Sequence, residues 1–128
     1  PKPAPPTAAE IGDPTVVKSV SEAQISEYAA VSGDRNPIHV SRVGAKAFGF
    51  PNVIAHGMWT AATLLGVVEG EIPRRARYSV EFGKPVILPA KLGIYARRGG
   101  AGDPAWSLAV RNPKKLETVH ATATIEEL

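Results

Sequence analysis

The chain has 128 residues, 44% of them hydrophobic and 21% charged, a composition typical of one soluble globular domain with a hydrophobic core. Its 15 basic and 12 acidic residues give a formal charge of +3, and scattered Lys and Arg with only 6% aromatic residues argue against nucleic-acid binding. The lack of cysteine excludes disulfides and thiol nucleophiles, and no apolar run reaches the ~18 residues of a membrane span. We therefore expect a cytoplasmic protein with no nucleic-acid partner and no membrane partner.

Residues 1–14 differ from the rest of the chain because they are rich in Pro and Ala. This composition is typical of a stiff, extended linker. We expect residues 1–14 to form a linker or tail and residues 15–128 to form one folded domain. A linker at this position favours an origin in a longer polypeptide.

The first half of the domain is expected to hold one strand and several helices. Residues 15–20 have a strand pattern, and Ser21 with Gln24 predicts a capping box at the start of a helix that ends at Gly33. Residues 41–47 predict a short helix. The next segment, 57–68, is nearly all apolar or small, which predicts a helix covered on most sides by other structure. Gly66 is expected to interrupt this helix and Gly70 to end it.

The second half of the chain alternates apolar and polar residues with a period of two, which predicts four antiparallel strands with one buried face. Tyr95 falls on the outward face in this pattern. A sheet of this kind and one apolar helix bury each other when the sheet curls around the helix, so we predict the α+β class. The residues expected to point inward are Tyr78, Val80, Phe82, Leu92, Ile94, Ala96, Trp106, Leu108, Val110, Val119, Ala121, Ala123 and Ile125.

One short segment combines an acid and a base. Asp34 and His39 stand five residues apart, in a turn that Gly33 and Pro37 are expected to hold out of helix. Neither side chain belongs to a repeating face, so packing gives no reason for the pair. Gly57 opens the apolar helix, where free N–H groups can meet a carbonyl oxygen or an anion. Together these are the minimum parts of an acid–base enzyme.

The run Gly-Asp-Arg-Asn-Pro-Ile-His at 33–39, followed by Ala-His-Gly-Met at 55–58, resembles the MaoC-like (R)-specific enoyl-CoA hydratases and 3-hydroxyacyl-thioester dehydratases. The resemblance covers residues 15–128 and implies the hot-dog fold, a curved antiparallel sheet wrapped around a central apolar helix. Residues 36–42 also resemble the dehydratase domains of type I fatty acid synthases. The chain has Ser41-Arg42 and Pro89-Ala90 where many members have Asp-Pro and Gly-Asp.

The resemblance implies that Asp34 and His39 are the catalytic pair and that Asn36 holds the turn. It also implies that the Gly57 N–H contacts the thioester carbonyl. His56 is expected either to line the pocket or to satisfy backbone groups at the helix start.

Met58 and Arg42 are also expected to contact the substrate, and neither a cofactor nor a metal site is expected. Met58 belongs to the same motif, and Arg42, with Lys46, is expected to contact the carrier phosphates, the alternative being the cluster 74–77. No cofactor is expected, because the thioester itself acidifies the C2 proton. No metal site is expected, because the three His lack the spacing to carboxylates that such a site needs.

The expected reaction is (R)-specific hydration of a trans-2-enoyl thioester, or the reverse dehydration of an (R)-3-hydroxyacyl thioester, in fatty acid metabolism. The carrier is CoA or acyl carrier protein. The alternatives are an acyl-thioesterase on the same fold and a non-catalytic acyl-binding half of a tandem hot-dog protein. A homodimer, or pairing with a second hot-dog domain, is expected because a half-open curved sheet leaves edge strands uncovered.

Overall fold

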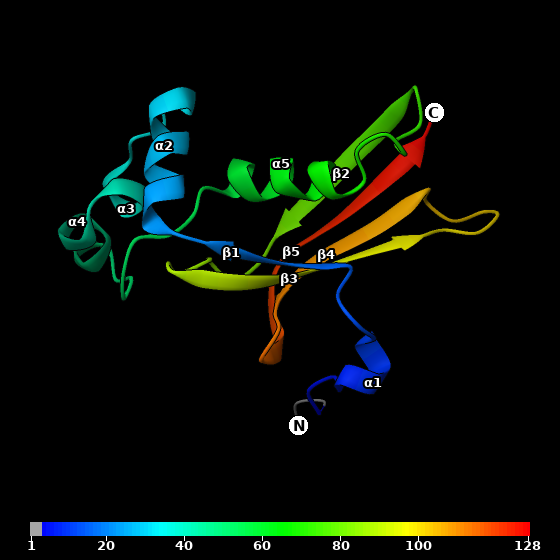
Figure 1. Cartoon of the computed structure of the whole chain (residues 1–128), viewed down its shortest axis with the longest axis horizontal. Helices are drawn as coiled ribbons and strands as arrows, with labels where there is room; N and C mark the ends of the chain where they lie inside the picture. The colour runs from blue at the N-terminus through cyan, green and yellow to red at the C-terminus, as the bar shows by residue number, and fades with distance from the viewer. Residues whose placement is uncertain (1–3) are drawn as a thin grey trace.

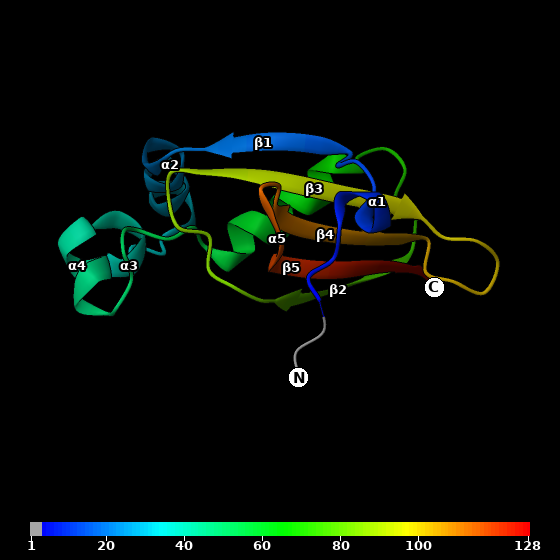
Figure 2. The same cartoon turned by 90° about the horizontal axis from the view of Figure 1, so that it is seen from below.

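A five-stranded antiparallel sheet forms the body of the molecule, as the computed structural model of residues 4–128 shows (Figure 1). Its strand order is β1-β3-β4-β5-β2, so β1 and β2 are the two edges. The turned view in Figure 2 shows helix α5 along one face of the sheet. The strands are β1 (Val16–Val20), β2 (Ala76–Phe82), β3 (Ala90–Arg98), β4 (Trp106–Asn112) and β5 (Lys115–Glu127).

The alternation predicted for the strands is confirmed in the core between the sheet and α5 (Gly57–Val67). Ile94, Ala121 and Ile125 are fully buried there, as is Leu64 of α5. The curved sheet around a helix is the arrangement of the hot-dog fold, so the predicted fold class is confirmed.

Two strand residues differ from the prediction. Tyr95 is buried although it lies on the outward face, because its ring covers Gly93, where an added Cβ would meet the Tyr95 hydroxyl at 3.1 Å. Phe82 is 54% exposed although it belongs to the inward set, because it lies at the end of the edge strand β2. Alternation predicts the face of a strand residue, but burial depends on what covers that face.

The helices begin and end where local capping allows. α2 (Glu22–Ser32) begins with the predicted capping box, in which Ser21 N–H donates to Gln24 Oε1 at 2.8 Å and Gln24 N–H donates to Ser21 Oγ at 3.2 Å. It ends at Gly33, which has a φ of +80°. α4 (Arg42–Ala47) is the predicted short helix, with Ser41 as its cap.

Three helix predictions are wrong. Pro37 begins the short helix α3 (Pro37–Val40) instead of excluding helix, because proline fits the first position, where no N–H bond is lost. Gly66 does not interrupt α5, and the helix ends at Val67, before Gly70. Within the expected tail, Thr7 and Glu10 form a capping box for α1 (Ala8–Ile11), a signal that the Pro/Ala composition hid. Residues 1–3 of that tail lie outside the described residues.

Among residues 4–128, no helix has the length and apolar character needed to cross a membrane.

Candidate active site

The turn between α2 and α3 is held by hydrogen bonds from side chains to the backbone. Asp34 Oδ1 accepts from the Asn36 N–H at 3.3 Å, and Asn36 Oδ1 accepts from the Ile38 N–H at 3.2 Å. The Asp34 N–H in turn donates to Ser32 Oγ at 3.2 Å. The structure therefore gives Asn36 the position of a turn-holding residue, because its side chain caps α3.

His39 is buried on α3, and its ring orientation is set by a single backbone contact. Its Nδ1 lies 2.7 Å from the Ile54 carbonyl oxygen, an acceptor, so Nδ1 carries the proton in the neutral ring. The other nitrogen, Nε2, then has a free lone pair. It lies 4.0 Å from Asp34 Oδ2. This separation is too long for a direct hydrogen bond and places a basic nitrogen opposite a carboxylate.

His56, which precedes α5, connects the two catalytic candidates. Its Nε2 donates to the Asp34 carbonyl oxygen at 2.7 Å, and its ring stacks on that of His39 with 3.8 Å between centroids. Tyr28 of α2 meets the His56 ring edge-on at 4.9 Å. The His56 Nδ1 is buried without a hydrogen-bond partner in the structure. His56 therefore lines a hollow at the start of α5 and holds the Asp34 backbone. Its side chain makes no hydrogen bond to the backbone at the start of α5, so the second of its expected roles is not seen.

The start of α5 faces a hollow of about 400 Å³, which we call the acid–base hollow. Gly57 and Met58 line it, and Met58 is 66% exposed. The first N–H groups of a helix have no partner within the helix, and they carry partial positive charge. A Cβ at Gly57 would lie 3.2 Å from the Phe82 ring, so glycine leaves room there. The lining residues are Tyr28, Ser32, Asp34, His56, Gly57, Met58 and Phe82.

Arg42 lies apart from the acid–base hollow and is already paired. Its Nη2 donates to Glu22 Oε2 at 2.7 Å and its Nε donates to Glu22 Oε1 at 3.2 Å, a two-pronged contact. This contact raises the pKa of the Arg42 guanidinium. It is also the largest cause of the lowered pKa of the Glu22 carboxyl, to which a hydrogen bond from Asn52 adds. The expected contact of Arg42 with a phosphate therefore stays a prediction, and it requires this ion pair to open.

A carboxylate and two imidazoles come close together at this site. Asp34, His39 and His56 offer possible ligand atoms within 4.8 Å of one another. The two rings are stacked with only 22° between their planes, so their in-plane lone pairs point along nearly parallel planes. An ion bound by both rings would need those planes to converge on it. The cluster is better arranged for proton transfer than for holding a metal.

Four residues of the site were absent from the sequence-based prediction, and one of them is Ser32, which lines the acid–base hollow and accepts from the Asp34 N–H. Ile54 contributes only its backbone carbonyl, which no side-chain pattern reveals. Phe82 comes from the edge of the sheet, 48 positions after Asp34 in the numbering, and contacts Gly57 only through the fold. Tyr28 had a detectable signal, because it lies on the same face of α2 as Ile25 and Ser32.

The chain belongs to the MaoC like domain family, whose sequence model matches residues 7–119. It is 48% identical, over its whole length, to the 3-hydroxyacyl-thioester dehydratase X of Mycobacterium tuberculosis, and it spans 44% of that protein. It is also 43% identical over 119 residues to the fatty acid synthase subunit beta of Saccharomyces cerevisiae, of which it spans 6%. The chain thus spans less than half of the length of these relatives.

Solved structures agree with this assignment. A crystal structure of HtdX from Mycobacterium tuberculosis matches with a TM-score of 0.83 and 48% identity, over 100% of this chain and 49% of that one. The R-hydratase PhaJ1 from Pseudomonas aeruginosa matches with a TM-score of 0.64 and 26% identity, over 94% of this chain and 85% of that one. The family suggested by the catalytic motif is therefore confirmed.

Proposed function

We propose that this domain is a hydro-lyase that adds water across the 2,3-double bond of a trans-2-enoyl thioester, or removes it from an (R)-3-hydroxyacyl thioester. The observation that carries the proposal is the pairing of Asp34 with the free Nε2 of His39 across 4.0 Å. The names of two relatives, a 3-hydroxyacyl-thioester dehydratase and a 3-hydroxybutyryl-CoA dehydratase, support it.

The first chemical step uses the gap between Asp34 and His39. A water placed there donates one hydrogen bond to the Asp34 carboxylate and one to His39 Nε2. As the water oxygen bonds to C3 of the enoyl group, His39 Nε2 takes a water proton. The pair then delivers a proton to C2, so that H and OH add to one face of the double bond. The Ile54 carbonyl supports this step, because it holds the ring with Nε2 toward Asp34.

The second requirement is relief of charge on the thioester oxygen, which becomes enolate-like during the reaction. The Gly57 N–H at the start of α5 is the proposed donor, assisted by the positive end of the helix dipole. Gly57, which has no side chain, and the exposed Met58 border the approach to that N–H group. No cofactor enters these steps, because the carbonyl of the substrate supplies the electron sink.

The two alternatives predict a different use of the same residues. A thioesterase needs a carboxylate aimed at the thioester carbon, but here the Asp34 carboxylate faces His39 and caps the Asn36 N–H. A non-catalytic half has no need of a buried base held by a backbone carbonyl. Both observations favour the hydro-lyase.

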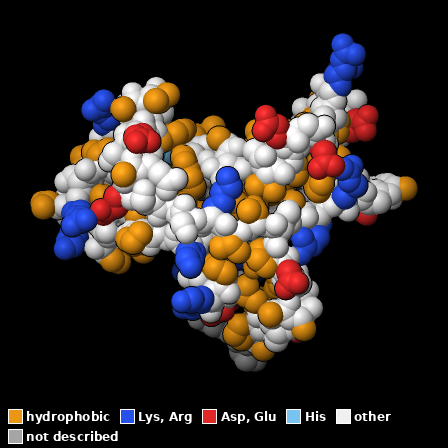
Figure 3. All heavy atoms as spheres, viewed as in Figure 1, with side chains coloured by type: hydrophobic (Ala, Val, Ile, Leu, Met, Phe, Trp, Pro, Cys, Tyr) orange, Lys and Arg blue, Asp and Glu red, His pale blue; other side chains and the backbone are white. Residues whose placement is uncertain are grey.

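We also propose that the domain pairs with a second hot-dog domain, in a homodimer or in one chain. The outer side of α5 and the end of β2 leave large apolar side chains exposed, including Met58 and Phe82 at 66% and 54%. Figure 3 shows hydrophobic side chains scattered over the face of the molecule that is seen in Figure 1. An unpaired edge strand beside such side chains is typical of an interface. Sedimentation of a stable, active monomer at micromolar concentration would contradict the pairing.

The direct test of the activity is incubation with crotonyl-CoA. We expect loss of the ultraviolet absorbance of the conjugated thioester and formation of the (R)-3-hydroxybutyryl product, identified by chiral analysis. Release of free CoA thiol without hydration would identify a thioesterase. A protein that binds crotonyl-CoA but changes nothing would be the non-catalytic half.

A further inference from the structure

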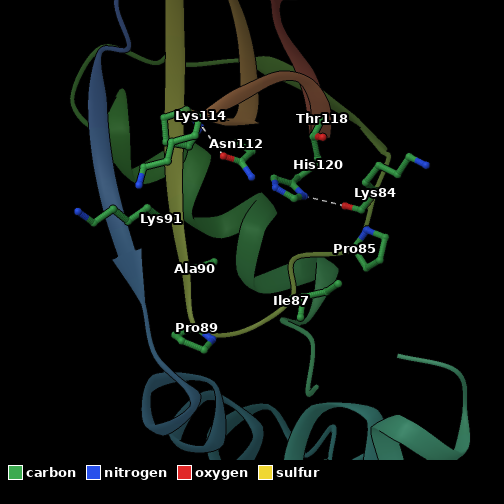
Figure 4. A pocket seen from close by; sticks show the side chains of 11 residues that line it. Lys84, Pro85, Ile87, Pro89, Ala90, Lys91, Asn112, Lys114, Thr118 and His120 are labelled. Carbon is green, nitrogen blue, oxygen red and sulfur yellow. Dashed lines mark hydrogen bonds between the residues drawn. The ribbon is translucent and has the colours of Figure 1, made fainter. Parts of the chain in front are cut away.

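A second hollow, of about 560 Å³, is lined by residues from the start of β3, the turn between β4 and β5, and the segment after β2. We call it the lysine hollow, because Lys84, Lys91 and Lys114 line it together with His120 (Figure 4). Its other walls are neutral and largely apolar, and no Asp or Glu is among its lining residues. The structure thus gathers three positive side chains around one cavity.

The frame of the lysine hollow is fixed by hydrogen bonds. His120 Nδ1 donates to the Lys84 carbonyl oxygen at 2.9 Å, which Figure 4 shows as a dashed line. The Lys84 N–H donates to the Val119 carbonyl oxygen at 2.9 Å, so the segment after β2 is tied to β5. The Lys114 N–H donates to Asn112 Oδ1 at 3.0 Å in the β4–β5 turn. These contacts fix the backbone of Lys84 and Lys114, and pairing with Ser19 of β1 fixes that of Lys91. All three lysines are exposed.

The three lysines have no acidic partner in the described part of the chain. The ion pairs of residues 4–128 involve His39, Arg42 and Arg98, each with a carboxylate, and none involves these lysines. Figure 4 shows Lys84 and Lys91 extending to opposite sides of the hollow. Three like charges around one cavity without counter-charges raise its positive potential, which attracts an anion. Lysine suits this task, because its compact ammonium binds phosphate as a point charge.

The lysine hollow is connected to the proposed catalytic residues by one isolated β-bridge. Ile87 lines the hollow and forms a β-bridge with Ile54, and the Ile54 carbonyl holds the His39 ring. In an antiparallel bridge the two Cα atoms are about 5 Å apart. Phe82 lines the acid–base hollow and Lys84 lines the lysine hollow, two residues further on. A single segment, residues 82–87, therefore borders both hollows.

We propose that the lysine hollow binds the phosphates of coenzyme A, the carrier of the thioester substrate; this inference rests on the proposed function. Coenzyme A carries a diphosphate and a separate monophosphate, which supply the negative charge that three lysines would meet. It also carries an adenine ring, which suits the apolar walls formed by Pro85, Ile87 and Pro113. The pantetheine arm of an acyl carrier protein has the same phosphate chemistry, but it offers only one phosphate and no adenine.

The test compares two substrates in two variants. Lys91→Gln/Lys114→Gln removes two charges from the hollow, and Lys18→Gln/Lys115→Gln removes two exposed charges outside it. We expect the first variant to raise the KM for crotonyl-CoA about tenfold or more, as for two lost charge-assisted contacts, with kcat unchanged. Its KM for crotonyl-pantetheine, which has no phosphate, is expected to stay at the parental value. The control variant is expected to leave both KM values unchanged.

Three results would overturn the proposal. One is an equal effect of the hollow variant on both substrates, and another is no effect on either. The third comes from crotonyl-acyl carrier protein, measured as an additional substrate. A rise in KM for it, with none for crotonyl-CoA, would assign the hollow to the arm of a carrier protein.

A binding experiment distinguishes a failure of this inference from a failure of the proposed function. Calorimetry with free coenzyme A requires no turnover, so it applies even if the parent hydrates neither substrate. We expect the hollow variant to bind coenzyme A about tenfold more weakly than the parent and the control, with a smaller dependence on salt. Equal dissociation constants in all three proteins would contradict the proposal.

Discussion

The acid–base hollow and the lysine hollow border the same segment, residues 82–87, but they hold their side chains in opposite ways. At the first, His56 lines the hollow and stacks on the ring of His39, and both rings are buried and bonded to backbone carbonyls. In the second, Lys84, Lys91 and Lys114 are exposed and only their backbone is fixed. Proton transfer requires atoms within a few tenths of an ångström of one geometry, whereas attraction of an anion requires only charge at the right place. Fixed rings therefore suit the reaction, and exposed lysines suit the recognition of a carrier.

The largest expected effect comes from the catalytic pair itself. Asp34→Asn and His39→Ala are each expected to lower kcat for crotonyl-CoA about 10²- to 10⁴-fold, because each removes one partner of the water. The double variant is expected to lose little more than the worse single variant, since both residues act on the same water. Steady-state kinetics measures kcat of the three variants, and circular dichroism serves as the folding control. Near-parental kcat in either single variant would break the assignment of the acid–base hollow.

A smaller effect is expected from His56→Phe, which tests whether the hydrogen bond from His56 to the Asp34 backbone contributes to catalysis. Phenylalanine keeps the stack on His39 but loses the bond from Nε2 to the Asp34 carbonyl. We expect kcat to fall about fivefold, in line with the ~1 kcal/mol that such a hydrogen bond contributes. The free energy of unfolding in urea is expected to change by less than ~1 kcal/mol, because the unpartnered Nδ1 is removed as well.

The matched variant for this prediction is His56→Gln. Its amide can still donate toward the Asp34 carbonyl, so it is expected to keep more of kcat than His56→Phe does. Equal losses in the two variants would show that the ring itself, and not its hydrogen bond, is what the site requires.

Arg42→Gln tests whether Arg42, in addition to the lysine hollow, contributes to recognition of the carrier. Because Glu22 already holds the Arg42 guanidinium, we expect KM to change by less than about threefold and equally for crotonyl-CoA and crotonyl-pantetheine. Measurement of the KM values for the two substrates shows whether Arg42 contacts a phosphate of the carrier. A rise confined to crotonyl-CoA would restore Arg42 as a phosphate contact and weaken the case for the lysine hollow.

The smallest expected effect is a pH dependence of stability at the same ion pair. Arg42 and Asn52 lower the pKa of the Glu22 carboxyl below its ordinary value of 4.5. A carboxyl whose pKa is lower in the folded state stabilises the fold above that ordinary value, and the contribution is lost as pH falls below it. We therefore expect the stability difference between the parent and Glu22→Gln to shrink between neutral pH and strongly acidic pH in urea unfolding.

The control for this measurement is Glu117→Gln, which removes the same charge from a carboxylate outside the ion pairs of residues 4–128. It is expected to show no such convergence with the parent. A Glu22→Gln difference that is constant with pH would contradict a role for the carboxylate charge in stability.

Local signals in the sequence predicted much of the fold and the reacting end of the site. Ser21 and Gln24 predicted the start of α2, and Gly33 its end, because capping depends on residues that are neighbours in the chain. Asp34, Asn36 and His39 could be selected as a unit for the same reason, since six positions of chain carry them. Pro37 was misjudged, because the same ring that breaks a helix interior is well suited to its first position.

The sequence by itself thus determined the caps and the alternation of the strands, and it selected the candidate acid and base, since each depends on a short stretch of chain. Only the tertiary structure decided what faces those residues. The Ile54 carbonyl that sets the tautomer of His39 is a backbone group with no sequence signature. Lys84, Lys91 and Lys114 come from three segments whose meeting depends on strand pairing between residues distant in the chain. Side-chain chemistry can be read from the chain one residue at a time, but proximity across a sheet arises only when the strands pair.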